Sequence, residues 1–275
     1  MLTKTIVVHL EHNDSSKARV ATAVEMASRH GAHLTGLFLS LEEFDGSLYG
    51  RARGRDLRGA REDRLTEESL QARLYFETAC KEAGLTSFRF ASEIGEDEKD
   101  LEIHARAADM LIVSDVQERN MEDRFVKGLP ETLALSSGLP VLVLPQEFDG
   151  AFDPQHILIA WKSSREAVRA VRDNIALLRS ARNVTVLSVG TSEETGRLPA
   201  DQVINFLSRH GIEADLRKDY GDNQPGKVIL NIADEIGADA LLMGAHGHPS
   251  WRNLVLGNTT RFVLRHHRMP LLLSH

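Results

Sequence analysis

The sequence predicts an α/β protein made of two similar halves, each a mainly parallel sheet with helices on both of its faces. Short apolar runs alternate with longer amphipathic segments along the chain, as strand–helix alternation requires. The apolar runs are almost continuous, as in TIVVHL at 5–10 and ALLM at 240–243, which is typical of parallel strands buried on both faces. The same succession of segments then occurs a second time.

The internal repeat is clearest where each half ends. Ala108–Val113 (ADMLIV) matches Ala238–Met243 (ADALLM), and Gly138–Leu144 (GLPVLVL) matches Arg268–Ser274 (RMPLLLS). Both pairs are offset by 130 residues, so the two endings align without a gap. A self-similarity of this length indicates one α/β unit that occurs twice.

A polar stretch with Gly and Pro, PQEFDGAFDPQ at 145–155, separates the two units. We therefore expect a first domain at residues 1–147 and a second at residues 153–275. A chain of 275 residues fits two domains of roughly 100–200 residues each. Its hydrophobic content of 42% is enough for a sizeable core.

Capping residues and glycines mark the elements of the first half. Asp14 or Ser15 can cap a helix that runs through His30 and stops at Gly31. Thr66 can cap a later helix that stops at Gly84, whereas the charged segment 40–64 before it is predicted to be a surface excursion. The strands expected here are 5–10, 34–39, 87–91, 110–113 and 140–144, and the helices are 14–30, 66–83, 97–107 and 130–136.

The second half repeats the scheme. Ser163 and Glu166 form a capping-box pattern that opens a helix to about Ser180, and Gly211 and Gly237 mark two later helix ends. The strands expected here are 156–161, 184–189, 212–218, 240–243 and 270–273, and the remaining helices are 199–210, 227–236 and one that follows Gly257.

Composition excludes several classes of protein. A net charge of −7 disfavours nucleic-acid binding through a broad basic face. The single cysteine, Cys80, excludes an intramolecular disulfide and is expected to be packed in the core. No apolar run approaches the ~20 residues that span a bilayer, and the first residues lack the apolar region of a signal peptide. We expect a cytoplasmic protein without a membrane partner.

Three glycines close to the end of the chain form a candidate anion site. Gly244 and Gly247 follow an apolar strand, and Gly257 comes after nine intervening residues, just before a helix. Glycine lets backbone N–H groups approach a ligand closely, and a helix N-terminus adds free N–H donors and a positive dipole end. Each glycine alone could equally be a turn or a helix start, but the combination points to phosphate.

The arrangement of strand, Gly-x-x-Gly, nine residues, Gly-Asn, helix and Pro-led strand resembles the nucleotide-binding motif of the universal stress protein family. The resemblance covers nearly the whole chain and identifies a tandem arrangement, with Ser40–Arg64 as the main part that has no counterpart in the second half. It implies a strand order of 3-2-1-4-5 in each half. It also implies that the halves pack as two subunits of a dimer do, largely through their last strands. The family normally has Ser or Thr at Asn258; here Thr259 stands beside it.

In this strand order the ligand lies beyond the carboxyl ends of the first and fourth strands, where the order reverses. Lys162 stands where the family often has an Asp that contacts adenine or ribose; a lysine cannot accept a hydrogen bond, so it either turns to phosphate or is a solvated loop residue. The resemblance implies the following nucleotide-binding residues: Ala160, Trp161, Lys162, Val189, Met243, Gly244, His246, Gly247, Arg252, Gly257, Asn258 and Thr259.

Several of these residues have alternative explanations. Val189 matches a position that lines the base pocket, but it could equally be plain core. His246 can face ribose or phosphate, and Arg252 can screen phosphate charge or simply be exposed on its loop. The histidines near the C-terminus, His266, His267 and His275, lack the spacing with carboxylates that a zinc site needs. No metal ligand is therefore assigned.

The first half lacks the motif. Ser114, Gln117 and Lys127 stand where the second half has its three glycines. Their side chains would occupy the space for phosphate oxygens, and a Cβ penalises left-handed backbone. We expect this half to act as a scaffold, a partner surface or a site for another ligand, unless a displaced anion site exists near Lys127 and Gly128.

Three functions remain open. The first is a stress-response regulator that binds ATP, ADP or AMP in its second half, with Mg²⁺ accompanying the phosphates. It would act on an unidentified protein partner, and it could form a homodimer. The second is a slow ATPase or nucleotidyl transferase; however, no Walker motif or carboxylate pair is present, and Ser163 and Ser164 are better explained as caps than as nucleophiles. No catalytic residue is therefore assigned. The third is an interaction module with both sites empty.

Overall fold

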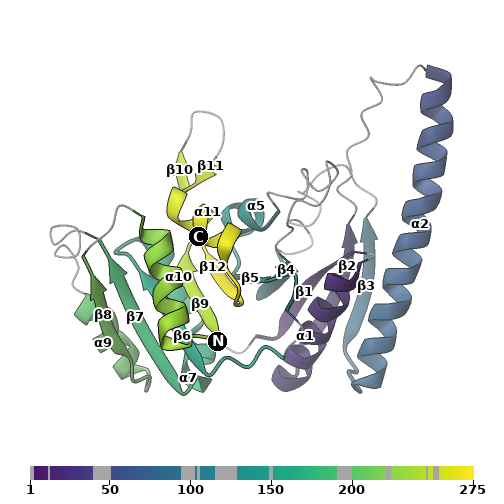
Figure 1. Cartoon of the computed structure of the whole chain (residues 1–275). Helices are drawn as coiled ribbons and strands as arrows, with labels where there is room; N and C mark the ends of the chain where they lie inside the picture. Colours follow the sequence, from purple (N-terminus) through teal and green to yellow (C-terminus); the bar gives the residue numbers. More distant parts are fainter. Residues whose placement is uncertain are drawn as a thin grey trace.

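The computed structural model describes residues 3–11, 13–39, 51–93, 103, 106–114, 129–148, 151–190, 200–220, 224–245, 247–249 and 254–275. Within these ranges one ten-stranded sheet has the order β3-β2-β1-β4-β5-β12-β9-β6-β7-β8 (Figure 1). Its strands are β1 Thr5–Leu10, β2 His33–Leu39, β3 Phe88–Glu93, β4 Met110–Ser114, β5 Val141–Leu144, β6 His156–Trp161, β7 Asn183–Val189, β8 Asp215–Asp219, β9 Ala240–Gly244 and β12 Leu271–Ser274. The helices are α1 Asp14–His30, α2 Arg51–Glu82, α5 Leu129–Ser136, α6 Arg165–Asp173, α7 Ile175–Ser180, α9 Ala200–Arg209, α10 Pro225–Ile236 and α11 Asn258–His266.

Each half of the sheet has the order that the sequence analysis expected. When the strands are numbered within each half, the first half has the order 3-2-1-4-5. The second half has the same neighbours, and because the two halves meet at their fifth strands, its order along the sheet reads 5-4-1-2-3. All neighbouring strands are parallel except the central pair, β5 and β12, which is antiparallel. The predicted fold class is therefore confirmed.

The central strand pair joins the halves about a local twofold axis. Leu142 lies opposite Leu272, and these residues are the two members of the 130-residue repeat. Both side chains are fully buried. Because equivalent residues face each other, the axis passes between them, and the two halves share one continuous sheet.

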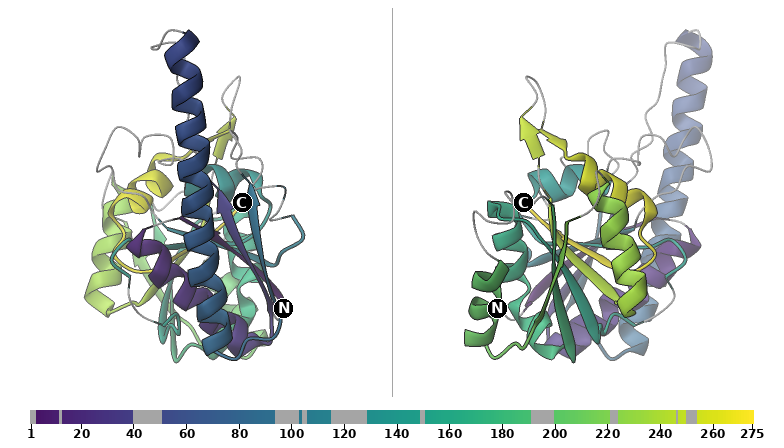
Figure 2. Two further views of the ribbon diagram at one scale, coloured as in Figure 1. Left: turned by 90° about the vertical axis from the view of Figure 1, so that its right-hand side faces the viewer. Right: turned by 60° about the vertical axis from the view of Figure 1, so that its left-hand side comes forward.

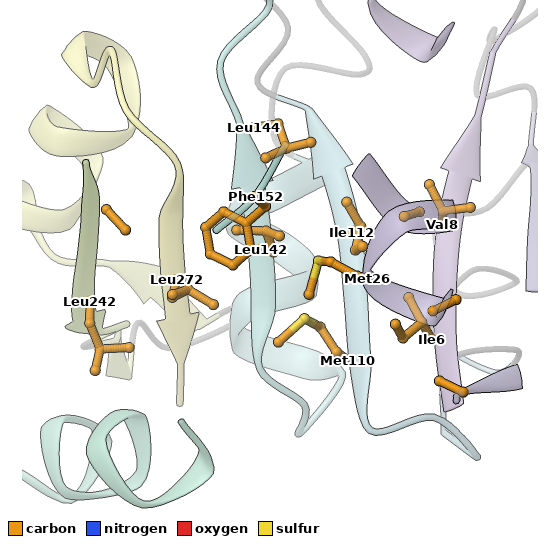
Figure 3. Close-up of a cluster of buried hydrophobic side chains, with 14 of the residues drawn as sticks. Ile6, Val8, Met26, Met110, Ile112, Leu142, Leu144, Phe152, Leu242 and Leu272 are labelled. Atoms are coloured by element: carbon orange, nitrogen blue, oxygen red, sulfur yellow. The ribbon is translucent and has the colours of Figure 1, made fainter. Parts of the chain in front are cut away.

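Helices cover both faces of the sheet (Figure 2). One face carries α1, α2, α6, α7 and α9, and the other carries α5, α10 and α11, as the two buried clusters show. The first cluster crosses the central pair without interruption: Met26 and Met110 of the first half approach Leu142, Phe152 and Leu272 (Figure 3). The two halves therefore share a hydrophobic core as well as a sheet.

The helix ends follow local chemistry, with two corrections to the expected caps. Asn13, rather than Asp14 or Ser15, caps α1 by accepting the backbone N–H of Ser16. Ser164, rather than Ser163, caps α6 by accepting the N–H of Ala167. In both cases the capping side chain lies one position away from the residue chosen from sequence, because the chain enters the helix one residue earlier or later. The expected stops at Gly31, Gly84, Gly211 and Gly237 are all left-handed glycines.

Helix α2 corrects the expectation of a surface excursion that ends near Arg64. The helix begins at Arg51 and continues through Thr66 without a break, while residues 40–50 lie outside the described ranges. Arg, Ala and Leu favour helix, and Thr66 needs no capping role inside a continuous helix. A buried stripe of Leu65, Phe76 and Cys80 holds its later part on the sheet. At 1.5 Å per residue the helix is far longer than strands of six or seven residues, so its first part extends beyond the sheet (Figures 1 and 2).

The helix expected up to Ser180 is broken at Asn174. The buried Asn174 donates from Nδ2 to the carbonyl of Ala170 at 2.9 Å, and its φ of −110° lies outside the helical range. Asparagine side chains compete in this way with helical hydrogen bonds, so the chain forms α6 and then α7.

Three other expectations differ or remain untested. The strand expected at 212–218 begins at Asp215, and the helix expected at 97–107 falls largely outside the described residues. A small hairpin, β10 Gly247–Pro249 with β11 Leu254–Leu256, was not expected. None of the helices in the described ranges has both the length and the hydrophobicity that crossing a membrane requires.

The central pair yields a stability prediction. Leu272→Ala should lower the free energy of unfolding by about 2–5 kcal/mol, because it leaves a cavity in a fully buried contact that both halves share. Leu74→Ala, at a side chain that is 52% exposed on α2, is the matched control and should change it by less than about 1 kcal/mol. Urea unfolding measures both, and equal losses in the two variants would contradict the importance of the central pair.

Candidate functional site

The candidate site lies where the strand order of the second half reverses, beyond the carboxyl ends of β6 and β9. Ala160 of β6 pairs with Met243 of β9, so the two residues lie side by side. Together with Val189 at the end of β7, they belong to or pack against the cluster under α10 and α11. The structure therefore brings these three predicted residues to the same face of the sheet.

Trp161, the last residue of β6, and Lys162, which follows it, lie apart from these three apolar residues. Trp161 packs against the cluster on the opposite face, and its Nε1 is buried without a hydrogen-bond partner. Lys162 is exposed, and its carbonyl accepts the N–H of Ser164 at 2.7 Å. The ammonium group of Lys162 is thus at the surface, at the end of the strand that leads into α6.

The small hairpin brings the second and third glycines together. Gly247 in β10 pairs with Leu256 in β11, and Leu256 directly precedes Gly257. Residues that are ten apart in sequence therefore lie next to each other at the start of α11. His246 and Arg252, also predicted for this site, lie outside the described residues.

The N-terminus of α11 lacks a side-chain cap. Gly257 is the N-cap residue, and it has no side chain that could accept a hydrogen bond from the first turn. The helices α1 and α6 are capped by Asn13 and Ser164, whereas α7 and α10 also begin without a side-chain cap. Because the first N–H groups of a helix have no partner within it, the start of α11 offers unused donors beside the exposed Asn258 and the half-buried Thr259.

Gly244 has a structural role that sequence reasoning missed. A Cβ at this position would lie 2.5 Å from the backbone N of Ala167 and 2.6 Å from the carbonyl carbon of Glu166. The end of β9 thus lies directly against the first turn of α6, and only glycine fits. The small residues Ala167 and Ala170 on α6 were the available sequence signal for this close contact.

The expected left-handed backbone at the motif glycines is wrong at two of the three positions. Gly257 has φ −64° and ψ 152°, which any residue can adopt, and Gly244 lies in a strand without positive φ. Space and donors, rather than backbone strain, therefore explain glycine at these positions.

In the first half, an ion pair between the buried Arg19 and the partly exposed Glu11 stands at the positions of Ala170 and Lys162. Helix α1 begins at Asp14 just as α6 begins at Arg165, 151 residues later, so Arg19 takes the place of Ala170. Arg19 is 1% exposed; its Nε donates to the carbonyl of His9 at 2.6 Å, and its Nη2 donates to the Glu11 carboxylate at 2.8 Å. Its Nη1 is buried without a partner.

The first half also differs at the positions of the motif glycines. Ser114, at the position of Gly244, is buried at the end of β4, so its Cβ precludes the close helix contact seen in the second half. Gln117, Lys127 and Gly128 lie outside the described residues, so the displaced anion site near them is not tested.

Burial and the ion pair shift two pKa values here. Burial, reinforced by the charge of Arg19, lowers the pKa of His9 to about 4 against the opposing effect of Glu11. Burial alone would raise the pKa of Glu11, but the charges of Arg19 and His9 and hydrogen bonds from Arg19 and Asn13 together lower it. His9 is therefore neutral and Glu11 ionised at neutral pH.

The C-terminal histidines all contact backbone. The Nδ1 atoms of His266, His267 and His275 lie 2.7–2.8 Å from the carbonyl oxygens of Phe262, Met269 and Ala245, respectively. Among the described residues, no group of three or more His, Cys, Asp or Glu side chains is placed to hold a metal ion.

The contact at Gly244 predicts a packing defect. Gly244→Ala should lower the free energy of unfolding by about 1–3 kcal/mol or more, because its Cβ meets helix backbone that cannot rotate away. Gly226→Ala is the control: its Cβ would also come within 2.8 Å of a neighbour, but the three nearest atoms belong to the Phe262 side chain. Thermal and urea unfolding should show the smaller loss for Gly226→Ala, and the reverse order would refute the packing role.

His9 predicts a pH dependence with a definite sign. Its pKa is about 4 in the folded protein and about 6.5 in the unfolded chain, so lowering the pH favours the unfolded chain, which binds the proton. Between pH 7 and pH 5 this residue should cost about 2 kcal/mol of stability. Urea unfolding of wild type and His9→Leu across this range measures the difference; identical pH slopes would contradict it.

The second half matches the model of the universal stress protein family over residues 154–275. Universal stress protein Slr1230 of Synechocystis sp. strain PCC 6803 is 27% identical to this chain over 157 residues. The aligned part covers 56% of this chain and 50% of the length of that relative.

Two solved structures extend the similarity to the whole chain. A universal stress protein from Archaeoglobus fulgidus aligns with 100% of this chain and 99% of its own at a TM-score of 0.75 and 15% identity. A protein of unknown function from Pseudomonas aeruginosa PAO1 covers 99% of this chain and 92% of its own at a TM-score of 0.63 and 16% identity. Residues 154–275 thus match the universal stress protein family, and the whole chain has the fold of a solved universal stress protein.

Proposed function

We propose that the chain is a stress-response regulator whose second domain, placed at residues 153–275, binds an adenine nucleotide: ATP, ADP or AMP. The observation that carries the proposal is the uncapped start of α11, next to which the hairpin places Gly247. Unused N–H donors and a positive helix end favour phosphate oxygens. The family match over residues 154–275 supports the same site.

The base has a matching apolar surface. Ala160, Val189 and Met243 lie on one face at the carboxyl ends of three adjacent strands, where ligands of such sheets bind. The phosphates would then extend towards Gly257, Asn258 and Thr259. Lys162 is exposed at the same end of the sheet and is available to pair with phosphate.

Binding rather than turnover is the proposed role. The described part of the site shows backbone donors and apolar residues, and we assign no residue as a base or nucleophile. Mg²⁺ can accompany the phosphates through their own oxygens. Occupancy would act on a protein partner in the cytoplasm, either from this chain alone or from a homodimer.

A second candidate is an interaction module without a nucleotide. One observation favours it for the first half: Glu11, at the position of Lys162, is already paired with the buried Arg19 and so is engaged within the chain. On the main proposal the first half is therefore a partner surface, and binding is restricted to one site per chain.

The proposal predicts one nucleotide per chain. Mass spectrometry of small molecules released by heat from the fresh protein, followed by ATP titration calorimetry, should find about one adenine nucleotide bound. Gly257→Val should abolish binding and leave the fold intact, because its backbone angles suit valine while the side chain would cover the helix donors. Gly244→Val is unsuitable for this test, since it would disturb the contact with α6.

The role of Lys162 is tested with a charge-matched control. If its ammonium pairs with phosphate, Lys162→Met should weaken ATP binding roughly tenfold or more, as loss of a hydrogen bond to a charged group does. Lys218→Met, at an exposed lysine on edge strand β8, should not weaken it. Two nucleotides per chain would show that the first half also binds; no nucleotide in either assay would favour the interaction module.

A further inference from the structure

A cavity lies between the two halves, away from the candidate nucleotide site. Its volume is about 130 Å³, and it lies between the last turns of α1 and the break between α6 and α7. The first half also contributes Thr3, Asp109 and Pro140, which lie one or two residues before β1, β4 and β5, respectively. In each half these residues lie toward the amino ends of the strands, whereas the nucleotide site lies beyond the carboxyl ends.

The cavity has an apolar floor of suitable size for a small ligand. Met26, Met110 and Phe152 line it, and Figure 3 shows these three side chains beside Leu142 of the central pair. An engineered apolar cavity of roughly 150 Å³ holds one benzene molecule, so this space suits a ring of that size. Ligand sites occur preferentially at interfaces between domains.

The local twofold symmetry breaks at this cavity. Met26 of α1 and Leu177 of α7 are equivalent positions, 151 residues apart, and both line the cavity. The preceding positions differ: α1 has Ala21-Thr22-Ala23 where the second half has Arg172-Asp173-Asn174. The second half therefore adds a polar wall and, through Asn174, the helix break, both at the same place.

The polar wall contains a carboxylate oxygen that lacks a donor. Asp173 Oδ2 is buried and accepts no hydrogen bond; it forms a long ion pair with Arg169, whose Nε lies 3.9 Å away. Arg172 lies over the Phe206 ring, with its guanidinium carbon 5.8 Å from the ring centroid. A buried carboxylate oxygen without a donor is costly, and a ligand N–H would satisfy it.

The other charged groups around the cavity also favour a donor ligand. The Asp109 carboxylate already accepts the backbone N–H groups of Lys4 and Thr5, at 2.6 and 2.9 Å. Burial, together with Arg29 and Lys4, lowers the pKa of His30, which leaves its ring uncharged at neutral pH. Asp109 and Asp173 thus both line the space, and Arg172, which lines it too, lies over the Phe206 ring.

We propose that this cavity binds a small apolar amine, whose apolar body lies between α1 and the α6–α7 break and whose N–H groups donate to Asp173. Such a ligand would contact both halves at once and so would stabilise their mutual packing. The site is distinct from the proposed nucleotide site, with which it shares no residue.

Methionine NMR of the full chain tests the proposal directly. Two of the six methionines, Met26 and Met110, line the cavity, whereas Met243 and Met269 do not. With ¹³C-methyl methionine labelling, benzylamine should shift the Met26 and Met110 signals saturably and leave those of Met243 and Met269 in place. Benzoate, which has the same ring and the opposite charge, should bind at least tenfold more weakly, as a lost charge-assisted hydrogen bond predicts.

Two variants and a control locate the contacts. Asp173→Asn should weaken benzylamine about tenfold without changing the effect of toluene, and Asp234→Asn, an exposed aspartate on α10, should change neither. Ala176→Leu fills the cavity and should remove the response to both ligands. Gly257→Val should leave the response intact.

The proposal is overturned if benzylamine does not shift Met26 and Met110. It is also overturned if benzoate binds as well as benzylamine, or if Asp173→Asn and Asp234→Asn behave alike. The comparison of benzylamine with benzoate uses the wild-type chain, so the test stands even if a variant fails to fold.

Discussion

The antiparallel pairing of β5 with β12 is the contact on which the rest of the molecule depends. The fifth strand of each half is not a free sheet edge, because it forms hydrogen bonds with the fifth strand of the other half. Leu142 faces Leu272 at the local twofold axis. An exposed sheet edge at this point would leave two rows of backbone groups and a fully apolar strand in water. The pairing removes both edges at once and aligns the helices of the two halves on common faces, which creates the shared core and the cavity between α1 and α6–α7.

Around this symmetric centre the two halves have diverged through the packing of one helix against one strand. In the second half, Gly244 lets the first turn of α6 lie directly against the end of β9. In the first half, Ser114 stands at the position of Gly244, and the buried Arg19, at the position of Ala170, forms an ion pair with the partly exposed Glu11. A buried ion pair is a costly way to fill a core, so its presence indicates specialisation of the first half rather than a gain in stability.

The sequence was sufficient for the fold and insufficient for the packing. The repeat and the stops at Gly31 or Gly237 follow from periodicity and from residues whose chemistry is local, whereas the strand order was implied by the family resemblance. The helix break at Asn174 and the clash at Gly244 depend on atoms that are close only in space, and no local pattern encodes them. The ion pair of Arg19 was missed for the same reason: an arginine on a predicted helix is usually solvated, and only the tertiary structure shows it buried. The resemblance named Ala160, Val189, Met243 and the start of α11 as site residues, which stays a prediction, and neither it nor the sequence pattern indicated the hairpin that brings Gly247 next to Gly257.

The helix starts of this molecule differ in whether a side chain caps them. Asn13 and Ser164 cap α1 and α6, so the first turns of those helices already have acceptors from the chain itself. The starts of α7, α10 and α11 have no side-chain cap, and among these α11 is the one that follows the glycine motif. Glycine at a helix start costs only a few tenths of a kcal/mol relative to Asn or Ser. Gly257 therefore leaves the first N–H groups of α11 open to an external acceptor at little cost in stability, and an anion is the acceptor that they favour. The missing cap is thus the structural consequence of the last glycine of the sequence motif.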